Sequence, residues 1–64
     1  MNSEELKAFL NKHKLNDTRL AEVLGVSQPA VNMWLNGHRG ISKPISRLLK
    51  TFDKYPQLIQ EFGK

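Results

Sequence analysis

The side chains best suited to recognition chemistry in this chain are carboxamides that recur at helical spacing near its middle. Gln28, Asn32 and Asn36 are four residues apart, and no charged residue occurs from Ser27 to Gly37. An amide offers both a hydrogen-bond donor and an acceptor, so a row of amides can read the polar edges of another molecule without fixed charge. This pattern favours recognition over bond-breaking chemistry.

Groups for catalysis or metal binding are scarce. The serines, histidines and acids form no recognisable set of nucleophile, base and orienting residue. His13 and His38 lack Cys or His partners at ligand spacing, cysteine is absent, and there is no glycine-rich phosphate loop. We therefore expect no enzymatic activity, no cofactor, no metal site and no disulfide.

Length and charge narrow the class of protein. At 64 residues the chain has room for one small domain, expected to span residues 1–64. The net charge of +4 and the pI near 9.8 are compatible with a polyanionic partner. No apolar stretch approaches the roughly 20 residues of a membrane span, and no export signal is recognisable, so the expected compartment is the cytoplasm. Basic residues dominate the second half, as Arg39, Lys43, Arg47, Lys50 and Lys54.

The apolar periodicity predicts five helices joined by short loops. Met1 and Asn2 are expected to be frayed. The first four helices are expected to start at the caps Ser3, Asn16, Ser27 and Ser42, and Pro56 is expected to open a short fifth helix. Their expected ends are at Lys12 or His13, at Leu24, at about Asn36, before Pro56 and before Gly63. These elements predict an all-α fold.

The second and third of these helices have the best-defined starts. Each cap is preceded by one apolar residue and followed four positions later by another, the pair that forms a hydrophobic staple. These sets are Leu15, Asn16 and Leu20, and Val26, Ser27 and Val31. Gly25 supplies a left-handed residue that ends the second helix. Two helices joined by Gly25-Val26-Ser27 have the layout of a helix-turn-helix.

The third helix, about residues 28–36, has two different faces at about 100° per residue. The apolar face carries Ala30, Val31, Trp34 and Leu35, with Trp34 expected in the core. An α-helix fits the major groove of DNA, where amides can pair with adenine and apolar groups can touch the thymine methyl. The candidates for base readout are therefore Gln28, Pro29, Asn32 and Met33. The alternative is that these are ordinary solvated surface residues.

Phosphate contacts need donors on both sides of that helix. Asn16 and Thr18 could combine side-chain and backbone donors at the start of the second helix, because a helix N-terminus attracts anions. The candidates on the other side are Asn36, His38, Arg39, Lys43 and Arg47. Each charge alone is explained by solvation, whereas the cluster indicates a phosphate-binding face.

The terminal helix carries more apolar surface than a small domain is expected to bury. Phe52 and most of the following aromatic and aliphatic residues are expected in the core. The surplus would suit contact with a second copy of the chain. The candidates for this dimer contact are Tyr55, Leu58, Ile59 and Phe62.

The chain resembles the phage-repressor and Cro-like (XRE) helix-turn-helix family over about residues 6–55. The resemblance is carried by Leu20-Ala21-Glu22-Val23-Leu24-Gly25-Val26-Ser27-Gln28-Pro29-Ala30-Val31, continuing to Trp34 and Asn36-Gly37. It implies a compact five-helix, lambda-repressor-like domain that binds operator DNA as a dimer, with its third helix in the major groove. By position it implies base-facing roles for Gln28, Pro29 and Met33, and backbone roles for Asn16, Asn36, Arg39 and Lys43.

One residue departs from the family pattern. Asp17 stands where a neutral polar donor is commoner, and its charge would repel phosphate. It either orients Gln28 or accepts a hydrogen bond from cytosine.

The leading expectation is a bacterial or phage repressor that binds double-stranded DNA at a pseudo-palindromic operator. The ending, with Leu48-Leu49, Tyr55-Pro56 and Leu58-Ile59, also looks like antitoxin regulators of the same family. The alternative is therefore an antitoxin or adaptor module whose main ligand is a protein partner, with DNA binding secondary.

Overall fold

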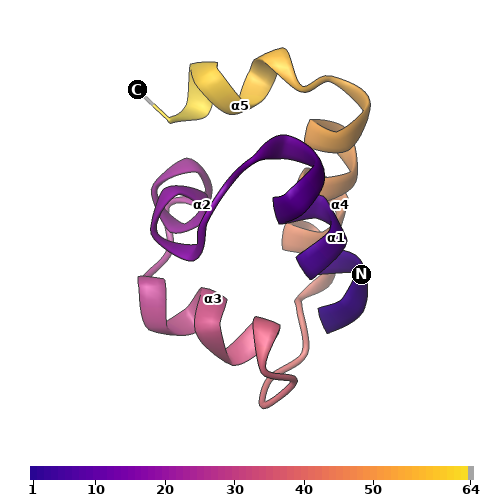
Figure 1. Cartoon of the computed structure of the whole chain (residues 1–64), viewed down its shortest axis with the longest axis vertical. Helices are drawn as coiled ribbons and strands as arrows, with labels where there is room; N and C mark the ends of the chain where they lie inside the picture. The colour runs from indigo at the N-terminus through magenta and orange to yellow at the C-terminus, as the bar shows by residue number, and fades with distance from the viewer. Residues whose placement is uncertain (64) are drawn as a thin grey trace.

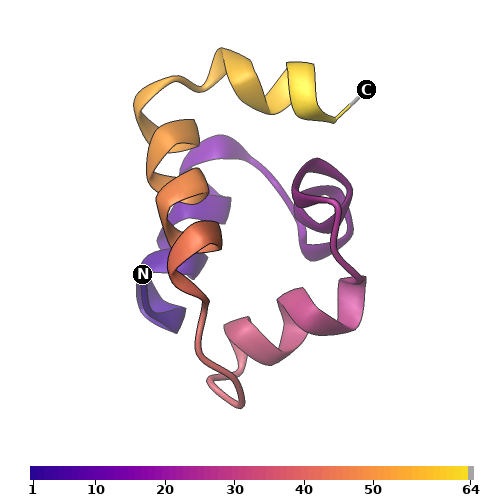
Figure 2. The same cartoon turned by 180° about the vertical axis from the view of Figure 1, so that it is seen from behind.

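The computed structural model describes residues 1–63, which form five helices and contain no strand (Figure 1). The helices are α1 (Ser3–His13), α2 (Asp17–Leu24), α3 (Gln28–Leu35), α4 (Lys43–Lys54) and α5 (Gln57–Phe62). Seen from either side, α5 runs across the end of the molecule opposite α3, as Figure 2 shows from behind. The predicted all-α architecture is confirmed.

The hydrophobic core takes side chains from all five helices. Each helix has apolar residues at helical spacing, so one stripe faces inward and buries against the others. The buried residues are Leu6, Phe9, Leu10, Leu20, Ala21, Val23, Val31, Trp34, Leu49, Phe52 and Ile59. The predicted core position of Trp34 is confirmed, with 7% of the residue exposed.

The α1–α2 and α2–α3 joints are built alike. Each starts with a residue in the left-handed conformation, Lys14 with φ 55° and Gly25 with φ 71°. The next residue is apolar, and its N–H donates back into the helix just completed, from Leu15 to Leu10 at 2.9 Å and from Val26 to Ala21 at 3.0 Å. This is a helix-closing motif in which an apolar residue follows the left-handed one. The role of Gly25 is confirmed, and Lys14 fills the same role without being glycine.

The third residue of each joint caps the next helix. The Asn16 Oδ1 accepts from the Arg19 N–H at 2.7 Å, and the Ser27 side chain accepts from the Ala30 N–H. Both predicted caps are confirmed. The apolar residues of the two staples are all in the core or packed against it.

The start of α1 differs from the prediction. Asn2, rather than Ser3, is the N-cap, because its Oδ1 accepts from the Glu5 N–H at 2.8 Å while the Glu5 carboxylate accepts from the Asn2 N–H at 3.2 Å. This reciprocal capping box orders the residues expected to be frayed. The Met1 ammonium also donates to the Ser46 Oγ at 2.7 Å.

The helices α4 and α5 start differently from the first three. Ser42 occupies the predicted cap position of α4, but within residues 1–63 its side chain makes no capping hydrogen bond. Pro44 lies in the first turn of α4, and Pro56 is the cap residue of α5, again without a side-chain cap bond in this part of the chain. Ser42 is therefore the N-cap residue of α4, as predicted, but the expectation that its side chain bonds to the first turn is wrong.

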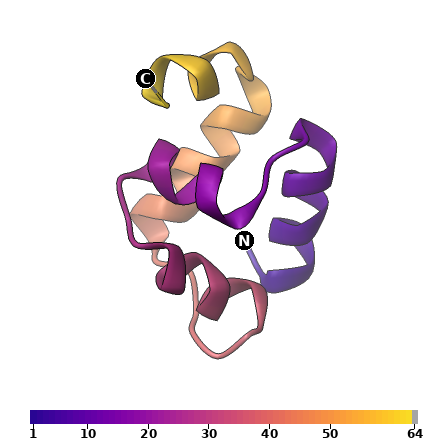
Figure 3. The ribbon, with the colours of Figure 1, turned by 60° about the vertical axis from the view of Figure 1, so that its left-hand side comes forward.

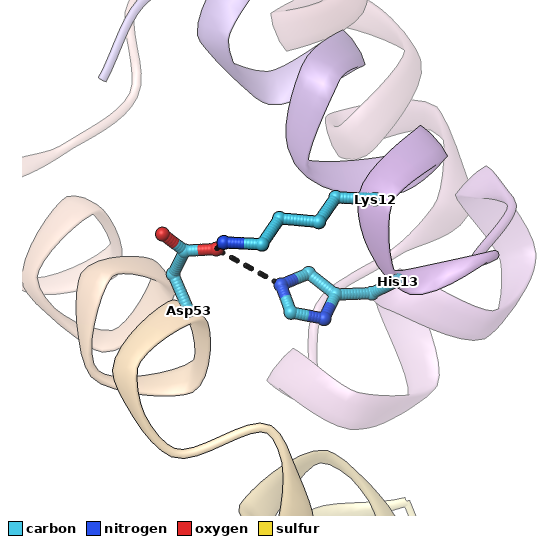
Figure 4. A network of polar contacts seen from close by, with 3 residues as sticks. All are labelled: Lys12, His13 and Asp53. Carbon is cyan, nitrogen blue, oxygen red and sulfur yellow. Dashed lines mark hydrogen bonds and ion pairs between the residues drawn. The ribbon is translucent and has the colours of Figure 1, made fainter.

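Contacts between distant residues hold the ends of α1 and α4 together. The Asp53 Oδ1 lies 3.0 Å from the Lys12 Nζ and 3.0 Å from the His13 Nε2 (Figure 4). His13 is nearly buried and its ring packs against Phe9 at a centroid distance of 4.5 Å. The His13 and Lys12 donors lower the pKa of the Asp53 carboxyl below its ordinary value.

A second long-range contact joins α2 to the end of α5. The Arg19 Nη1 donates to the Gly63 carbonyl at 2.8 Å and also pairs with Glu22 at 3.1 Å. The short α5 thus packs on α2 near the described C-terminal end, as the ribbon also shows (Figure 1).

Within residues 1–63, no helix combines the length and the apolar character that crossing a membrane requires. The same residues bring together no group of three or more His, Cys, Asp or Glu side chains that could hold a metal ion.

Candidate nucleic-acid interface

The two faces of α3 separate packing from exposed chemistry. Val31 is fully buried and Trp34 nearly so, whereas Gln28 and Pro29 are exposed and 44% of Met33 is exposed. This division is the one that the periodicity predicted. The outer face of α3 therefore presents amide, proline and thioether groups with no formal charge.

Asn32 is the least exposed of the four predicted base-readout residues. It is half-buried, and its Nδ2 makes a long, 3.5 Å contact with the Gln28 carbonyl one turn earlier. Its side chain also lies close enough to Asp17 to help lower the pKa of that carboxyl. Asn32 thus belongs to the same cluster as Gln28, at the edge of the exposed face.

A direct hydrogen bond ties the first turn of α3 to the first turn of α2. The Gln28 Nε2 donates to the Asp17 Oδ2 at 2.8 Å, and the Thr18 N–H donates to the Asp17 Oδ1, also at 2.8 Å. These donors, with Gln28 the largest influence, lower the pKa of the Asp17 carboxyl. Of the two roles considered for Asp17, the geometry shows contact with Gln28.

The predicted phosphate donors at the start of α2 are partly engaged within the chain. The Asn16 Oδ1 is used by the Arg19 N–H, so the Asn16 Nδ2 is the atom that can donate to a phosphate. Thr18 is exposed, but its N–H is taken by Asp17, and its hydroxyl lies 3.5 Å from the same carboxylate. The backbone of this helix end offers less to an anion than its sequence suggested.

The other flank follows α3 directly in the chain. Gly37 has φ 73°, and the His38 N–H donates back to the Met33 carbonyl at 3.0 Å, so the loop folds over the end of α3. Figure 3 brings the α2 and α3 side forward and shows this loop beyond the end of α3. All five predicted phosphate donors on this flank are exposed, namely Asn36, His38, Arg39, Lys43 and Arg47.

The start of α4 adds two aligned cations to this flank. Lys43 is its first residue and Arg47 lies four positions later, so both lie on one face of the helix. The exposed amide face of α3 therefore has the start of α2 at one end and a basic segment at the other.

The predicted dimer-contact residues split into exposed and buried ones. Tyr55 is 45% exposed and Phe62 is 51% exposed, Leu58 is half-buried, and Ile59 is buried at 7%. Phe62 also packs edge-on against Phe52 at a centroid distance of 5.1 Å. Ile59 is part of the core of its own chain, which leaves Tyr55 and Phe62 as the main apolar surface here.

Sequence reasoning missed the contacts that lie outside any local pattern. The contact of Arg19 with Gly63 and the contacts of Asp53 with Lys12 and His13 have no short-range signal, because the partners are about forty residues apart in the chain. Asn2 did have one, because the spacing from Asn2 to Glu5 is that of a capping box.

A family model described as Helix-turn-helix matches residues 6–57, from the first turn of α1 to the start of α5. No curated protein and no solved structure matched the chain. The matched span includes α2, the Gly25 joint and α3, together with both flanks of the exposed face. It covers well over half of the 64 residues. The chain therefore belongs to the phage-repressor and Cro-like (XRE) helix-turn-helix family, whose members are regulators that bind double-stranded DNA.

Proposed function

We propose that this chain is a sequence-specific repressor of the Cro or phage-repressor type, which places α3 in the major groove of its operator. The observation that carries the proposal is the outer face of α3, where Gln28, Pro29 and Met33 are exposed, half-buried Asn32 lies at the edge and no residue is charged. Such a face can meet base edges through hydrogen bonds and apolar contact. Repression would follow from occupying a promoter in the cytoplasm, at the nucleoid, without chemistry.

The flanks supply the charge and the positioning that this docking requires. Asn16 and Thr18 lie at the start of α2, which the hydrogen bond between Asp17 and Gln28 ties to the start of α3. Arg39, Lys43 and Arg47 follow the other end of α3 in the chain. Contacts to phosphates set the register of a protein on the duplex and carry most of the salt dependence. In this proposal α3 determines which bases are preferred, and the flanking residues supply most of the binding affinity.

A binding-site selection from random duplexes, repeated with two variants, tests this division. Gln28→Ala is expected to cost roughly 1–3 kcal/mol at one base position and to relax preference there only. Lys43→Ala is expected to weaken binding to all sequences and to reduce the salt slope by about 1. A change of base preference in Lys43→Ala would contradict the assigned roles, and the absence of any sequence-dependent binding would contradict the proposal itself.

The second part of the proposal is a two-fold dimer on a pseudo-palindromic operator, formed through the exposed surface of Tyr55, Leu58 and Phe62. Two copies would then read half-sites about 34–36 Å apart, one helical turn of DNA. Tyr55→Ser is expected to weaken binding to a palindromic duplex and to leave binding to a single half-site unchanged. Equal loss on both duplexes would place Tyr55 outside the dimer contact.

The exposure of Tyr55 and Phe62 also favours one other function. In that alternative the chain is an antitoxin or adaptor module that binds a protein partner through residues 52–62, with DNA binding secondary. Titration of labelled operator and unrelated duplexes at two salt concentrations separates the two functions. Binding that ignores sequence and vanishes at higher salt would favour the protein-binding module.

A further inference from the structure

The hydrogen bond between Asp17 and Gln28 can form in only one orientation of the glutamine amide. An ionised carboxylate accepts hydrogen bonds and cannot donate, whereas an amide has a donor end and an acceptor end. The Asp17 Oδ2 lies 2.8 Å from the Gln28 Nε2, so the nitrogen end faces Asp17. The second carboxylate oxygen is held by the Thr18 N–H at 2.8 Å, which fixes the carboxylate on α2.

We propose that Asp17 is a positioning residue that locks the Gln28 amide so that α3 selects a base offering a hydrogen-bond donor in the major groove. Adenine N6 and cytosine N4 are the only such donors, since guanine and thymine present acceptors at the corresponding positions. The inference rests on the proposed placement of α3 in the major groove, and it assigns the Gln28 Oε1 as the atom that reads the base.

The same geometry ranks adenine above cytosine. The Gln28 Nε2 carries two N–H bonds, of which one is donated to Asp17. The other can donate to adenine N7, which neighbours N6, so adenine can form two hydrogen bonds with one amide. Cytosine has only its N4 donor in the major groove and can form one.

The carboxylate carries a second effect through its charge. Asp17 is the first residue of α2, beside Asn16 and Thr18, which are expected to contact a phosphate. Its negative charge therefore opposes the approach of that phosphate. Like any aspartate outside an apolar site, Asp17 is ionised at neutral pH and therefore accepts hydrogen bonds without donating, and the contacts with Gln28 and Thr18 lower its pKa further. An amide at this position would remove the charge. With its oxygen on the Thr18 N–H, its nitrogen would face Gln28 and would require the glutamine amide to turn its oxygen end inward.

The test is a site selection with the whole chain and the variants Asp17→Asn, Gln28→Ala and Glu22→Gln. Glu22→Gln removes the same charge from the same helix and serves as the matched control. For the wild type we expect adenine to exceed guanine and thymine by about tenfold at one position of each half-site, with cytosine between them. Asp17→Asn is expected to admit guanine and thymine there while raising affinity for every duplex, and Glu22→Gln is expected to leave the preference unchanged.

The outcomes separate this inference from the proposed function. If Gln28→Ala abolishes the preference at that position but Asp17→Asn preserves it, the positioning role is overturned and the major-groove assignment stands. If Gln28→Ala changes no preference, both are overturned. A shift caused equally by Glu22→Gln would assign the effect to net charge and would also overturn the positioning role.

A second measurement needs no DNA. In NMR spectra of the free protein, the Gln28 side-chain amide signals are expected to shift as acid protonates Asp17, at a pH below the ordinary range of an aspartate, because the charged acceptor becomes a weaker, neutral one. The Trp34 indole signal reports whether the core is intact over the same range. Signals that move equally in the wild type and in Asp17→Asn would show that the carboxylate does not hold the amide and would overturn the inference.

Discussion

The first three helices and the last two are held in place by different kinds of interaction. α1, α2 and α3 begin at caps whose side chains accept a backbone N–H, and both joints between them are three residues long. Among the described residues, α4 and α5 begin without such a bond, and α5 has only six residues. They are held in place by the buried side chain of Phe52 and by contacts with residues far away in the chain, from Asp53 to Lys12 and from Gly63 to Arg19.

The starts of the first three helices are thus determined by nearby residues, whereas α4 and α5 are held in place by tertiary contacts. A cap, a left-handed residue and an apolar pair act over a few residues, so the start of α3 is fixed by its own neighbourhood. The position of α5 depends on the rest of the molecule having folded. Four predictions test the contrast, from the largest expected effect to the smallest.

Removing the main core side chain of α4 should unfold the protein. Phe52 is fully buried, and truncating a buried Phe to Ala typically costs about 3–5 kcal/mol. A domain this small has a total stability of only about 3–5 kcal/mol, so Phe52→Ala is expected to lose its helical circular dichroism at 25 °C. Phe62→Ala, at a residue that is 51% exposed, should stay folded with a lower melting temperature. Similar melting curves for both variants would show that burial does not distinguish them.

The joint between α2 and α3 should depend on its left-handed residue. No described atom lies within 4 Å of a Cβ placed at Gly25 or at Gly40, but only Gly25 of these two has a left-handed φ, 71°. Gly25→Ala should therefore cost about 1–2 kcal/mol in urea denaturation, whereas Gly40→Ala should not destabilise the protein. Lys14→Gly should have the opposite sign and stabilise by about 0.5 kcal/mol, because Lys14 carries the same strain. Equal losses at both glycines would point to a cause other than backbone conformation.

The two kinds of helix start should respond differently to loss of the cap side chain. Asn16→Ala is expected to cost about 1 kcal/mol, since the Arg19 N–H loses its 2.7 Å partner. Ser42→Ala should change the free energy of unfolding by no more than a few tenths of a kcal/mol, because among residues 1–63 the Ser42 side chain makes no capping hydrogen bond. Chemical denaturation of both variants measures the difference. A loss at Ser42 as large as that at Asn16 would remove the contrast between the two halves.

Acid should weaken both halves slightly. The pKa values of Asp17 and Asp53 are lowered in the folded chain, so their contribution to stability is complete above the unfolded pKa of about 3.9. It is lost as the pH falls through the lowered folded values. The melting temperature should therefore fall below about pH 4, and Asp53→Asn should make that fall shallower. A fall as steep in Asp53→Asn as in the wild type would show that the contacts with Lys12 and His13 contribute nothing.

The sequence predicted the locally specified part of the fold well. Staple, cap and glycine spacing placed the starts of α2 and α3, and periodicity placed Gln28 and Trp34 on opposite faces of α3. The start of α1 was misplaced because Asn and Ser are both good N-cap residues. Only Asn2 is followed three residues later by a glutamate, Glu5, which completes a capping box.

Contacts between residues far apart in the chain could not be predicted from the sequence. Asp53 meets Lys12 and His13 across about forty residues, and no short-range rule pairs them. The same holds for the surface of α5, because periodicity alone could not decide that Ile59 would be buried and Phe62 half exposed. In the candidate site, the sequence suggested a contact between Asp17 and Gln28 but left a second role open, and the 2.8 Å distance shows the contact.

The eight residues of α3 keep folding and surface chemistry on opposite sides, with Val31 buried and Gln28, Pro29 and Met33 exposed. Changes on the outer side thus leave the packed side intact. A lineage of such proteins can drift to new targets without first acquiring extra stability to compensate. A library that varies these three exposed positions, with proline left out at Met33 because it would break the helix, should stay folded. That tolerance makes α3 a practical starting point for directed evolution.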